Sequence, residues 1–299
     1  MRTAFISELI AQARTNPRLF LVVGDLGFTV VEPFAAEFPD RYLNAGVAEQ
    51  NMTGVAAGLA SEGYQVFTYS IGNFPTLRCL EHIRNDICYP RLPVTVTAVG
   101  GGVAYGNLGY SHHAVQDLAI MRALPNLTVY SPADPGEARE CLRLILERSQ
   151  PAYLRLGKAG EPALHGVRGV ANGLLEVRAG TAPIALAATG SILKSALEAA
   201  NRLSDKGLDV AVYSCPVLCA EPPAVFAPLW RHQTVLAVEE HGAAGGFGSS
   251  LKEVAPAGVR IRICALTQET FSLVGSQDFL RRQAGLDGEG LANLALQLV

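Results

Sequence analysis

The chain has 299 residues, of which 49% are hydrophobic and 17% charged, and its formal net charge at pH 7 is -3. A chain of this length and apolar content has room for two domains with a substantial buried core. The slight acidic balance excludes the basic surface that binding to a nucleic-acid backbone requires, so we expect no nucleic-acid partner.

Cysteine usage and the N-terminus indicate a cytoplasmic protein. The closest cysteines, in "CPVLC" (215–219), are separated by three residues, which fits neither a redox motif nor a zinc site. We therefore expect no metal and buried thiols in a reducing compartment. Residues 1–17 have helical spacing and carry Glu8, unlike a signal or transit peptide. No apolar run approaches the roughly 20 residues of a membrane span, so we expect no membrane partner.

Short β-rich runs alternate with helical patterns through the first half of the chain. They cover residues 19–23, 64–69, 94–99, 127–130 and 152–156. The segments between them are long enough for crossover helices. This arrangement predicts a parallel sheet covered on both faces.

A second β-α series follows an irregular stretch. Periodicity fails in residues 157–173, where Gly and Pro accumulate, and a new strand begins at 183. A helix capped by Ser191 and ending at Gly207 leads to a strand at 208–213, and further strands follow at 234–241 and 259–264. We predict an α/β fold with one domain at 1–160, a linker at 161–181 and a smaller domain at 182–299.

The turn "GDLG" (24–27) follows the first strand, where open α/β sheets place ligand-binding loops. A tight turn in which Asp25 caps neighbouring backbone explains it equally well. The chain has neither a G-x-G-x-x-G fingerprint nor a phosphate loop.

The stretch "YLNAGVAEQNM" (42–52) places Glu49 near the start of a helix. We expect Asn44 to cap this helix, and a negative charge in its first turn is favoured by the helix dipole. That is a sufficient structural reason for Glu49. However, the small residues of "GVAAGLA" (54–60) predict close packing and little water around the carboxylate, which suits proton exchange with a ligand.

Two further segments combine turns with aromatic side chains. Phe74 follows a Gly-Asn turn between a strand and a helix, where a core phenylalanine is the ordinary alternative. A loop with five glycines between Gly100 and Gly109 precedes Ser111, His112 and His113. Such long loops are usually functional. Adjacent histidines on a helix point about 100° apart, so we expect one of them to face a site and no metal.

These four segments, in this order, resemble the pyrimidine-binding domain of thiamine-diphosphate enzymes of the transketolase family. The likeness covers residues 1–156 and is carried by "GVAEQNM", "SHH" with "DLAIMRALPN", and "SPADPGEA". Residues 182–299, with "ATGS", "VEEH" and "GGFG", look like the family's C-terminal domain. The closest likeness is to split transketolases, in which this half is a separate subunit.

The resemblance implies roles for individual residues. Glu49 matches the carboxylate that hydrogen-bonds a ring nitrogen of the aminopyrimidine and activates the cofactor, and Phe74 matches the aromatic that stacks on that ring. Asp25, with Leu26 beside it, matches the aspartate near the thiazolium. His112 matches a histidine that contacts substrate and shuttles protons. A substrate phosphate is assigned to Thr29, Arg155 and Lys158.

The Gly-rich loop departs from the pattern of standard transketolases. Their G-E-D-G-x-T-H-Q reads "GNLGYSHH" (106–113) here, so Leu108 replaces an aspartate that recognises a sugar hydroxyl, and Gly100 falls where a substrate-contacting histidine is expected. Each charge-assisted hydrogen bond lost costs about 1.5–3 kcal/mol. We therefore expect a differently shaped acceptor pocket for a modified or nucleotide-linked sugar, formed by Tyr105, Asn107, Tyr110 and His113.

The chain also lacks the Gly-Asp-Gly motif, with its downstream Asn, that holds the diphosphate and Mg2+ in this family. The resemblance therefore implies a partner subunit equivalent to the N-terminal half of a transketolase, in an α2β2 assembly. Thiamine diphosphate would be shared between the subunits, and Mg2+ would be held mainly by the partner.

The implied reaction transfers a two-carbon ketol unit from a ketose to an aldehyde. Two alternatives stay open. One is decarboxylation of pyruvate followed by acyl transfer, as in deoxyxylulose-phosphate synthases or pyruvate-dehydrogenase beta subunits. The other is a non-catalytic scaffold subunit, against which the combination of Glu49, Phe74 and His112 argues.

Overall fold

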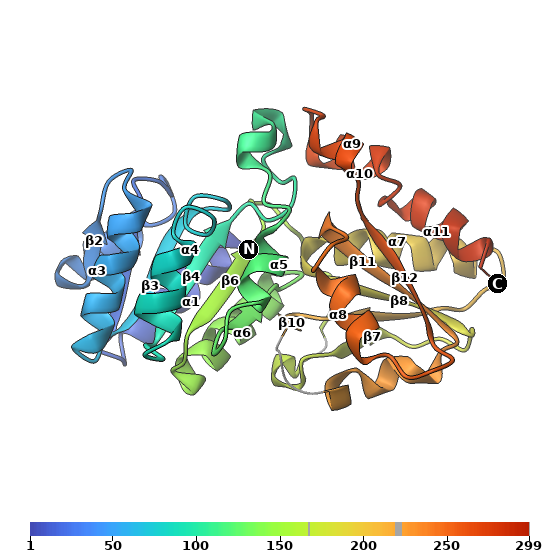
Figure 1. Ribbon diagram of the computed structural model, residues 1–299, viewed down its shortest axis with the longest axis horizontal. Coiled ribbons are helices and arrows are strands. Elements are labelled where there is room, and N and C mark those ends of the chain that lie inside the picture. The colour runs from blue at the N-terminus through green and yellow to red at the C-terminus, as the bar shows by residue number, and fades with distance from the viewer. Residues whose placement is uncertain (167, 219–222, 299) are drawn as a thin grey trace.

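Two α/β halves lie side by side, each built around its own sheet (Figure 1). The computed structural model describes residues 1–166, 168–218 and 223–298. The predicted fold class, two α/β domains with mostly parallel sheets, is confirmed. Within the described residues, no helix combines the length and the apolar character that crossing a bilayer needs.

The first sheet has seven strands in the order β10-β5-β6-β4-β3-β1-β2. All neighbours in it are parallel except β10 and β5. Its strands are β1 (Leu19–Val23), β2 (Tyr42–Asn44), β3 (Gln65–Ile71), β4 (Val94–Val99), β5 (Thr128–Tyr130), β6 (Ala152–Leu156) and β10 (Val217–Leu218).

Helices cover both faces of this sheet, as a parallel sheet requires. One face packs against α1 (Arg2–Ala13) and α6 (Pro135–Arg148). The other packs against α3 (Glu49–Ser61), α4 (Leu80–His82) with the π-helical turn Ile83–Cys88, and α5 (Asp117–Arg122). The short helix α2 (Glu32–Glu37) lies between β1 and β2 in the chain.

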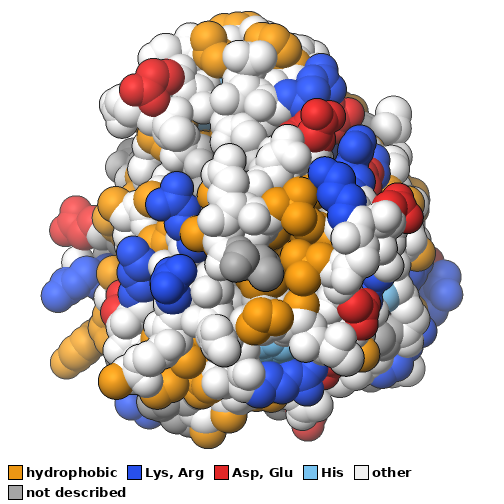
Figure 2. Space-filling view, turned by 90° about the vertical axis from the view of Figure 1, so that its right-hand side faces the viewer, with side chains coloured by type: hydrophobic (Ala, Val, Ile, Leu, Met, Phe, Trp, Pro, Cys, Tyr) orange, Lys and Arg blue, Asp and Glu red, His pale blue; other side chains and the backbone are white. Residues whose placement is uncertain are grey.

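The second sheet has five strands in the order β12-β11-β8-β9-β7. Its strands are β7 (Leu175–Arg178), β8 (Ile184–Thr189), β9 (Ala211–Ser214), β11 (Thr234–Gly242) and β12 (Arg260–Leu266). Its helical segments are α7 (Leu193–Ser204), the 3-10 helix Pro223–Arg231, α8 (Phe247–Val254), α9 (Gln268–Phe271), α10 (Gln277–Gln283) and α11 (Gly288–Leu296). On the end of the molecule that this half presents, acidic and basic side chains form small separate groups between apolar ones (Figure 2).

The two halves are less separate than the sequence predicts. The expected linker at 161–181 contains β7, which pairs antiparallel with β9. Strand β10, from the second half of the chain, pairs Val217 with Tyr130 at the edge of the first sheet. One cluster of buried apolar side chains also continues from the first sheet to the second. The halves are therefore joined by a strand pairing and by a shared core.

Two predictions about individual side chains can be compared with the structure. Ser191 does not cap α7, because a 3-10 turn (Gly190–Ile192) precedes the helix and the Ser191 Oγ accepts a hydrogen bond of 2.9 Å from Arg281 Nη2. Cysteines 79, 88, 141, 215 and 264 are free and buried, as expected. Burial raises the pKa of the Cys88 thiol to about 12. Cys219 lies outside the described residues.

Candidate active site

Most of the predicted site residues lie on segments that follow parallel strands of the first sheet. The segments at 24–31, 72–79 and 100–116 follow β1, β3 and β4, and residue 158 comes two positions after β6. Because the carboxyl ends of parallel strands share one edge, these segments converge there, as in other open α/β sheets. In Figure 1 the longest of them, the loop after β4, projects from this edge beside α9 and α10.

Glu49 is the first residue of α3, and its side chain is 2% exposed. Its Oε2 accepts a hydrogen bond of 2.6 Å from Arg78 Nη1, and its Oε1 a longer one of 3.4 Å from Ser70 Oγ. A Cβ on Gly24, at the end of β1, would meet the Glu49 side chain at 3.6 Å. The carboxylate is thus held between the ends of two strands, β1 and β3, and the first turn of a helix, whose dipole favours its charge.

Asn44 does not cap α3, because the helix begins only at Glu49, after Ala48. Instead the Asn44 side chain accepts from Gly46 N at 2.9 Å and donates to Asp25 Oδ1, also at 2.9 Å. This arrangement connects the loop after β1 with the segment that leads into α3. The prediction of an Asn44 cap was therefore wrong, since the chain needs four more residues to turn into the helix.

Phe74 and His112 come together next to Glu49. Their rings make an edge-to-face contact with centroids 5.4 Å apart. The guanidinium of Arg78 lies 5.3 Å from the centre of the Phe74 ring while it holds Glu49. The structure therefore brings the predicted carboxylate, aromatic and histidine into one continuous group through Arg78, a residue that the sequence did not single out.

Asn73 attaches the Gly-rich loop to the turn that carries Phe74. Its Nδ2 donates to the carbonyl of His113 at 2.6 Å and, more weakly, to that of Ser111 at 3.4 Å. On the loop itself, Ser111 Oγ lies 2.9 Å from His112 Nδ1. Hydrogen bonds made by Asn73, next to Phe74, and by Ser111, next to His112, thus support the contact between the two rings.

The loop after β1 has an unusual backbone. Asp25, Gly27 and Thr29 have φ values of 53°, 92° and 67°. Such conformations cost of order 1–3 kcal/mol for residues other than glycine and cluster at functional sites. Asp25 and Thr29 are exposed, and Leu26 is half-buried. The loop therefore presents both polar side chains outward at the same sheet edge as Glu49.

Tyr105 occupies the space next to Gly100. A Cβ on Gly100 would come within 2.2 Å of the Tyr105 ring, and Gly100 has a φ of 86°. Burial raises the pKa of the Tyr105 hydroxyl. On its other side, the exposed Lys158 places Nζ 5.4 Å from the centre of the ring. The space that a side chain at position 100 would fill is thus occupied by the Tyr105 ring, and the Lys158 ammonium group lies beside this ring.

Two other residues of the expected acceptor pocket differ in exposure. Asn107 is exposed on the loop, as a substrate contact would need. His113 is fully buried, and burial lowers its pKa, while the backbone of Gly106 and Phe271 opposes the shift. This placement corrects the assignment of His113 to the pocket, because a ring with no exposed surface packs the loop from inside.

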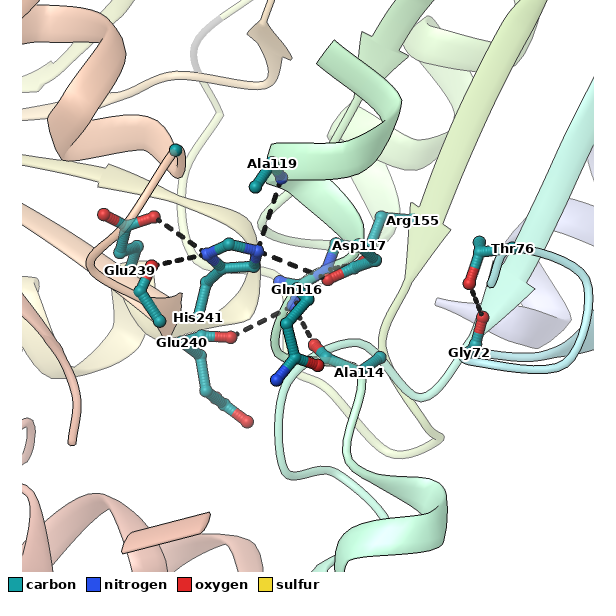
Figure 3. Close-up of polar contacts among 12 residues, drawn as sticks. Gly72, Thr76, Ala114, Gln116, Asp117, Ala119, Arg155, Glu239, Glu240 and His241 are labelled. Carbon is teal, nitrogen blue, oxygen red and sulfur yellow. Dashed lines mark hydrogen bonds and ion pairs between the residues drawn. The ribbon is translucent and has the colours of Figure 1, made fainter. Parts of the chain in front are cut away.

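Arg155 also lies away from the candidate site. Its Nε donates to Asp117 Oδ2 at 2.7 Å, and its Nη2 donates to the carbonyls of Ala114 and Glu240 at 2.8 and 3.0 Å (Figure 3). Its side chain is only 5% exposed. Burial alone would raise the pKa of Asp117, but the Arg155 guanidinium, His241 and the Tyr153 hydroxyl together outweigh it, and the pKa is lowered. The expected phosphate contact is corrected: Arg155 joins the two halves from inside.

The residues that sequence reasoning missed share one property. Ser70, Asn73 and Arg78 act through contacts with residues 21 to 40 positions away. Arg78 stands one helical turn after Phe74 in a mostly apolar stretch, and this isolated charge was the only signal. Chemically, the group combines a buried carboxylate, an aromatic face and a histidine, which suits a flat heteroaromatic ring with a protonatable nitrogen.

Both halves of the chain match family models. Residues 1–160 match "Transketolase, pyrimidine binding domain" and residues 173–290 match "Transketolase, C-terminal domain". The chain is similar to a solved structure described as "Split gene transketolase, inactive beta4 tetramer", with a TM-score of 0.86 and 30% identity. That similarity covers 99% of this chain and 96% of the solved one.

Two relatives show the range of functions among similar chains. One subunit of the apulose-4-phosphate transketolase of Actinobacillus succinogenes is 31% identical over 98% of this chain and 96% of its own length. The 1-deoxy-D-xylulose-5-phosphate synthase 1 of Geobacter sulfurreducens is also 31% identical, over 97% of this chain but 47% of its own length. This chain therefore corresponds to nearly the whole of one relative and to about half of the other.

Proposed function

Since this chain belongs to the transketolase family, we propose that it is one subunit of a split, thiamine-diphosphate-dependent enzyme that transfers a two-carbon ketol unit. The donor is a ketose or ketose phosphate, and the acceptor is an aldehyde or a modified sugar. The observation that carries the proposal is the buried Glu49 carboxylate, which lies against Arg78 and beside Phe74. The full-length similarity to one subunit of another transketolase supports it.

The residues present fit the pyrimidine half of thiamine diphosphate. Among the residues that the structure describes, Glu49 Oε1 has one hydrogen bond, the 3.4 Å contact with Ser70, so it retains capacity to accept another from a protonated ring nitrogen. Phe74 is half-buried and offers an aromatic surface next to Arg78, the residue that holds the other oxygen of Glu49. We infer that Glu49 and Phe74 hold this part of the cofactor, and that Asp25 and Leu26 bind it near the thiazolium.

When bound, thiamine diphosphate supplies the carbanion chemistry that breaks and forms the carbon–carbon bond. Glu49 holds a proton at the ring nitrogen of the pyrimidine, and burial keeps water from competing for it. Phe74 orients the ring. His112, in contact with Phe74, faces the substrate and moves protons to and from its hydroxyl groups.

The remaining substrate contacts follow the sheet edge. Tyr105 and Asn107 bound the acceptor pocket from the Gly-rich loop. Lys158 and Thr29, both exposed, bind a substrate phosphate or another anionic group. Arg155 and His113 do not take part, because both are buried in contacts within the chain.

The diphosphate half needs a partner. Within the residues that the structure describes, no group of three or more His, Cys, Asp or Glu side chains could hold a metal ion. The chain also lacks the Gly-Asp-Gly motif with a downstream Asn that holds both groups in this family, so we assign Mg2+ and the diphosphate to a subunit equivalent to the N-terminal half of a transketolase, in an α2β2 assembly. A solved relative described as an inactive beta4 tetramer supports the need for such a partner.

Three further proposals concern the chain as a whole. We place the pyrimidine-binding domain at residues 1–160 and the C-terminal domain at 182–299, with β7 of the connecting segment added to the second sheet. The acceptor is a small sugar rather than a macromolecule. Because its described cysteines are free and buried, we place the protein in the reducing cytoplasm.

A second reaction, with pyruvate as the donor, should be assayed in parallel. The similarity to a deoxyxylulose-phosphate synthase favours pyruvate as an alternative donor, with decarboxylation followed by acyl transfer. The two reactions use the same cofactor and differ in the donor. Assays with ketose phosphates and with pyruvate therefore separate them.

The test uses the complex of this chain with its partner, purified together and supplied with thiamine diphosphate and Mg2+. We expect ketol transfer from ketose donors, and a loss of turnover of about 100-fold or more in the Glu49→Gln complex. Glu62→Gln, at the exposed end of the same helix, is the matched control and should keep full activity. Unchanged turnover in Glu49→Gln would exclude the catalytic role of this residue.

Cofactor binding tests the split site separately. Titrating thiamine diphosphate into this chain alone should give no tight, Mg2+-dependent binding, whereas the complex should bind it. Submicromolar binding by the chain alone would contradict the proposal that the diphosphate half lies on the partner.

A further inference from the structure

The structure assigns a positioning role to Glu240, a carboxylate of the C-terminal domain. We propose that it fixes the Gly-rich loop 100–114 in place, and with it the substrate-binding side chains on the loop. This inference rests on the proposed function for the role of the loop. It adds a task for the C-terminal domain: holding the acceptor pocket in its working shape.

The loop is closed at its base, and its exposed residues lie around its tip, at Asn107, Leu108, Tyr110 and Ser111. Gly102 and Ala114 form an isolated antiparallel bridge with hydrogen bonds of 2.9 and 2.8 Å, and this bridge defines the two ends of the loop. Between them lie two short 3-10 turns, Gly106–Leu108 and Tyr110–His112. Such short turns are weak supports. The position of the loop therefore depends on contacts from outside.

Glu240 supplies the contact at the base. Its side chain is buried, and its Oε1 accepts a hydrogen bond of 2.7 Å from the backbone nitrogen of Val103, a residue 137 positions earlier in the chain. The same carboxylate accepts 2.9 Å from Gln277 Nε2 and 2.7 Å from Arg281 Nε. The loop amide thus binds to a carboxyl group that is itself held by two side chains of α10.

The sequence of the loop also permits the close approach between the loop backbone and the Glu240 side chain. A Cβ on Gly102 would come within 2.5 Å of the Glu240 side chain, and Gly102 has a φ of 68°, where side chains are disfavoured. Only glycine allows the loop to pass the carboxylate at this distance. The sequence of the loop and the carboxylate of the other domain are therefore matched to each other.

A second contact follows the loop outward. Gly275 N donates to the carbonyl of Gly106 at 3.2 Å, and a Cβ on Gly106 would come within 2.5 Å of the Gly275 oxygen. Farther along, the rings of Tyr110 and Phe271 lie 6.4 Å apart. The segment from α9 to α10 thus runs beside the loop, which Figure 1 shows at the top of the molecule.

The neighbouring carboxylate provides an internal comparison. Glu239 is equally buried and precedes Glu240 on β11, but side chains of adjacent strand residues point to opposite sides. Glu239 accepts from Phe247 N and Gly248 N at 2.7 and 2.9 Å, at the start of α8. Figure 3 shows the two side chains leaving the strand in different directions. Glu239 therefore supports its own domain and does not touch the loop.

Loss of the Glu240 side chain should change the fraction of molecules in which the loop is in its binding position. Without its acceptor the Val103 amide is left unpaired, and the loop spends a smaller fraction of time in the binding position. Apparent substrate affinity falls in proportion to that fraction. Glu49 and Phe74 lie on other segments, so the affinity for thiamine diphosphate should stay the same when the affinity for substrate falls.

The experiment compares Glu240→Ala, Glu240→Gln and Glu239→Gln in the complex with the partner subunit. For Glu240→Ala we expect amide hydrogen exchange in residues 101–110 to be about tenfold faster and the acceptor KM to rise about tenfold. The Kd for thiamine diphosphate should stay within about twofold. Glu240→Gln, which keeps an acceptor for Val103 N, should restore part of both effects. Glu239→Gln should leave loop exchange and KM unchanged.

Three results would overturn the proposal. The first is unchanged exchange at 101–110 in both Glu240 variants. The second is an equal rise of KM in Glu239→Gln, which would indicate general loosening of the domain. The third is a loss of kcat with constant KM. If the wild-type complex transferred no ketol unit at all, the proposed function would fail, but hydrogen exchange would still decide whether Glu240 holds the loop. Should Glu240→Ala not assemble, Glu240→Gln carries the same comparison.

Discussion

Arg78 and Glu49 form an ion pair in which Nη1 and Oε2 are 2.6 Å apart, yet one partner is 47% exposed and the other only 2%. A buried carboxylate is costly without such a partner. The exposed partner can leave at low cost, because its charge regains water. This asymmetry fits a carboxylate that keeps its partner on Oε2 when the site is empty and can accept a ligand at Oε1.

The first prediction concerns the stability of this pair. Arg78→Met should lower the free energy of unfolding of the chain by about 1–2 kcal/mol, because Glu49 loses its short hydrogen bond. The loss should be smaller than the roughly 3–5 kcal/mol that results when one partner of a fully buried ion pair is removed, since the arginine is half exposed. Urea denaturation measures it. Arg84→Met, an exposed arginine of the following turn, is the control and should change stability by less than about 0.5 kcal/mol.

The second prediction concerns Gly100 and Tyr105. Gly100→Ala should destabilise the chain by about 1–3 kcal/mol, because the new methyl group meets the Tyr105 ring and the backbone has a φ of 86°. Gly207→Ala separates the two causes, since Gly207 has a φ of 79° but nothing within 4 Å of an added Cβ. If both variants lose the same stability, the ring does not fill this space. A coupling above about 0.5 kcal/mol between Gly100→Ala and Tyr105→Ala would confirm the contact.

The third prediction is a pH dependence of stability. Burial raises the pKa of Glu239 from 4.5 to about 7. Between these values the folded chain keeps a proton that the unfolded chain has released, so this residue's contribution to stability falls as the pH rises. The fall is on the order of 3 kcal/mol. Urea denaturation from about pH 5 to about pH 8, at constant protein concentration, should show this slope in the wild type and lose it in Glu239→Gln. Parallel pH profiles would contradict it.

The fold was predictable where the sequence carries long apolar runs. The strands at 19–23, 94–99 and 152–156 were predicted with their observed bounds. The three strands that were missed, β2, β7 and β10, have three, four and two residues and lie at or next to a sheet edge. Strands this short have no readable alternation, and their hydrogen bonds come from distant parts of the chain. These short strands form because neighbouring strands pair with them, and local sequence patterns do not reveal which strands are neighbours.

The site was predictable where a motif specifies a residue together with its place in the fold. Glu49, Phe74 and His112 were assigned from such motifs, and the structure places them in one group through Arg78. Arg155 was assigned because the resemblance places it at or near a position that binds a substrate phosphate in relatives. Residues of a strand alternate between faces, and this one points into the contact between the halves, where Asp117 binds it. Asp117 lies 38 positions away and the Glu240 carbonyl belongs to the other domain, so local sequence reveals neither partner.

The fourth prediction separates this arginine from the neighbouring lysine. Arg155→Met should destabilise the chain by about 3–5 kcal/mol, because it leaves the buried Asp117 carboxylate without its cation. Lys158→Met should change stability by less than about 0.5 kcal/mol, since the lysine is exposed. In the complex, Lys158→Met should instead raise the KM for a phosphorylated substrate, while the KM for an unphosphorylated one stays constant. Urea denaturation and steady-state kinetics give the two readouts.

A double variant provides the control for the structural role of Arg155. Asp117→Asn combined with Arg155→Met removes both charges and should lose less stability than the two single variants added together, since neither charge is then left buried alone. Strict additivity would mean that the two residues do not act as a pair. A selective rise of KM for phosphorylated substrates in Arg155→Met, with stability unchanged, would return this arginine to the substrate site.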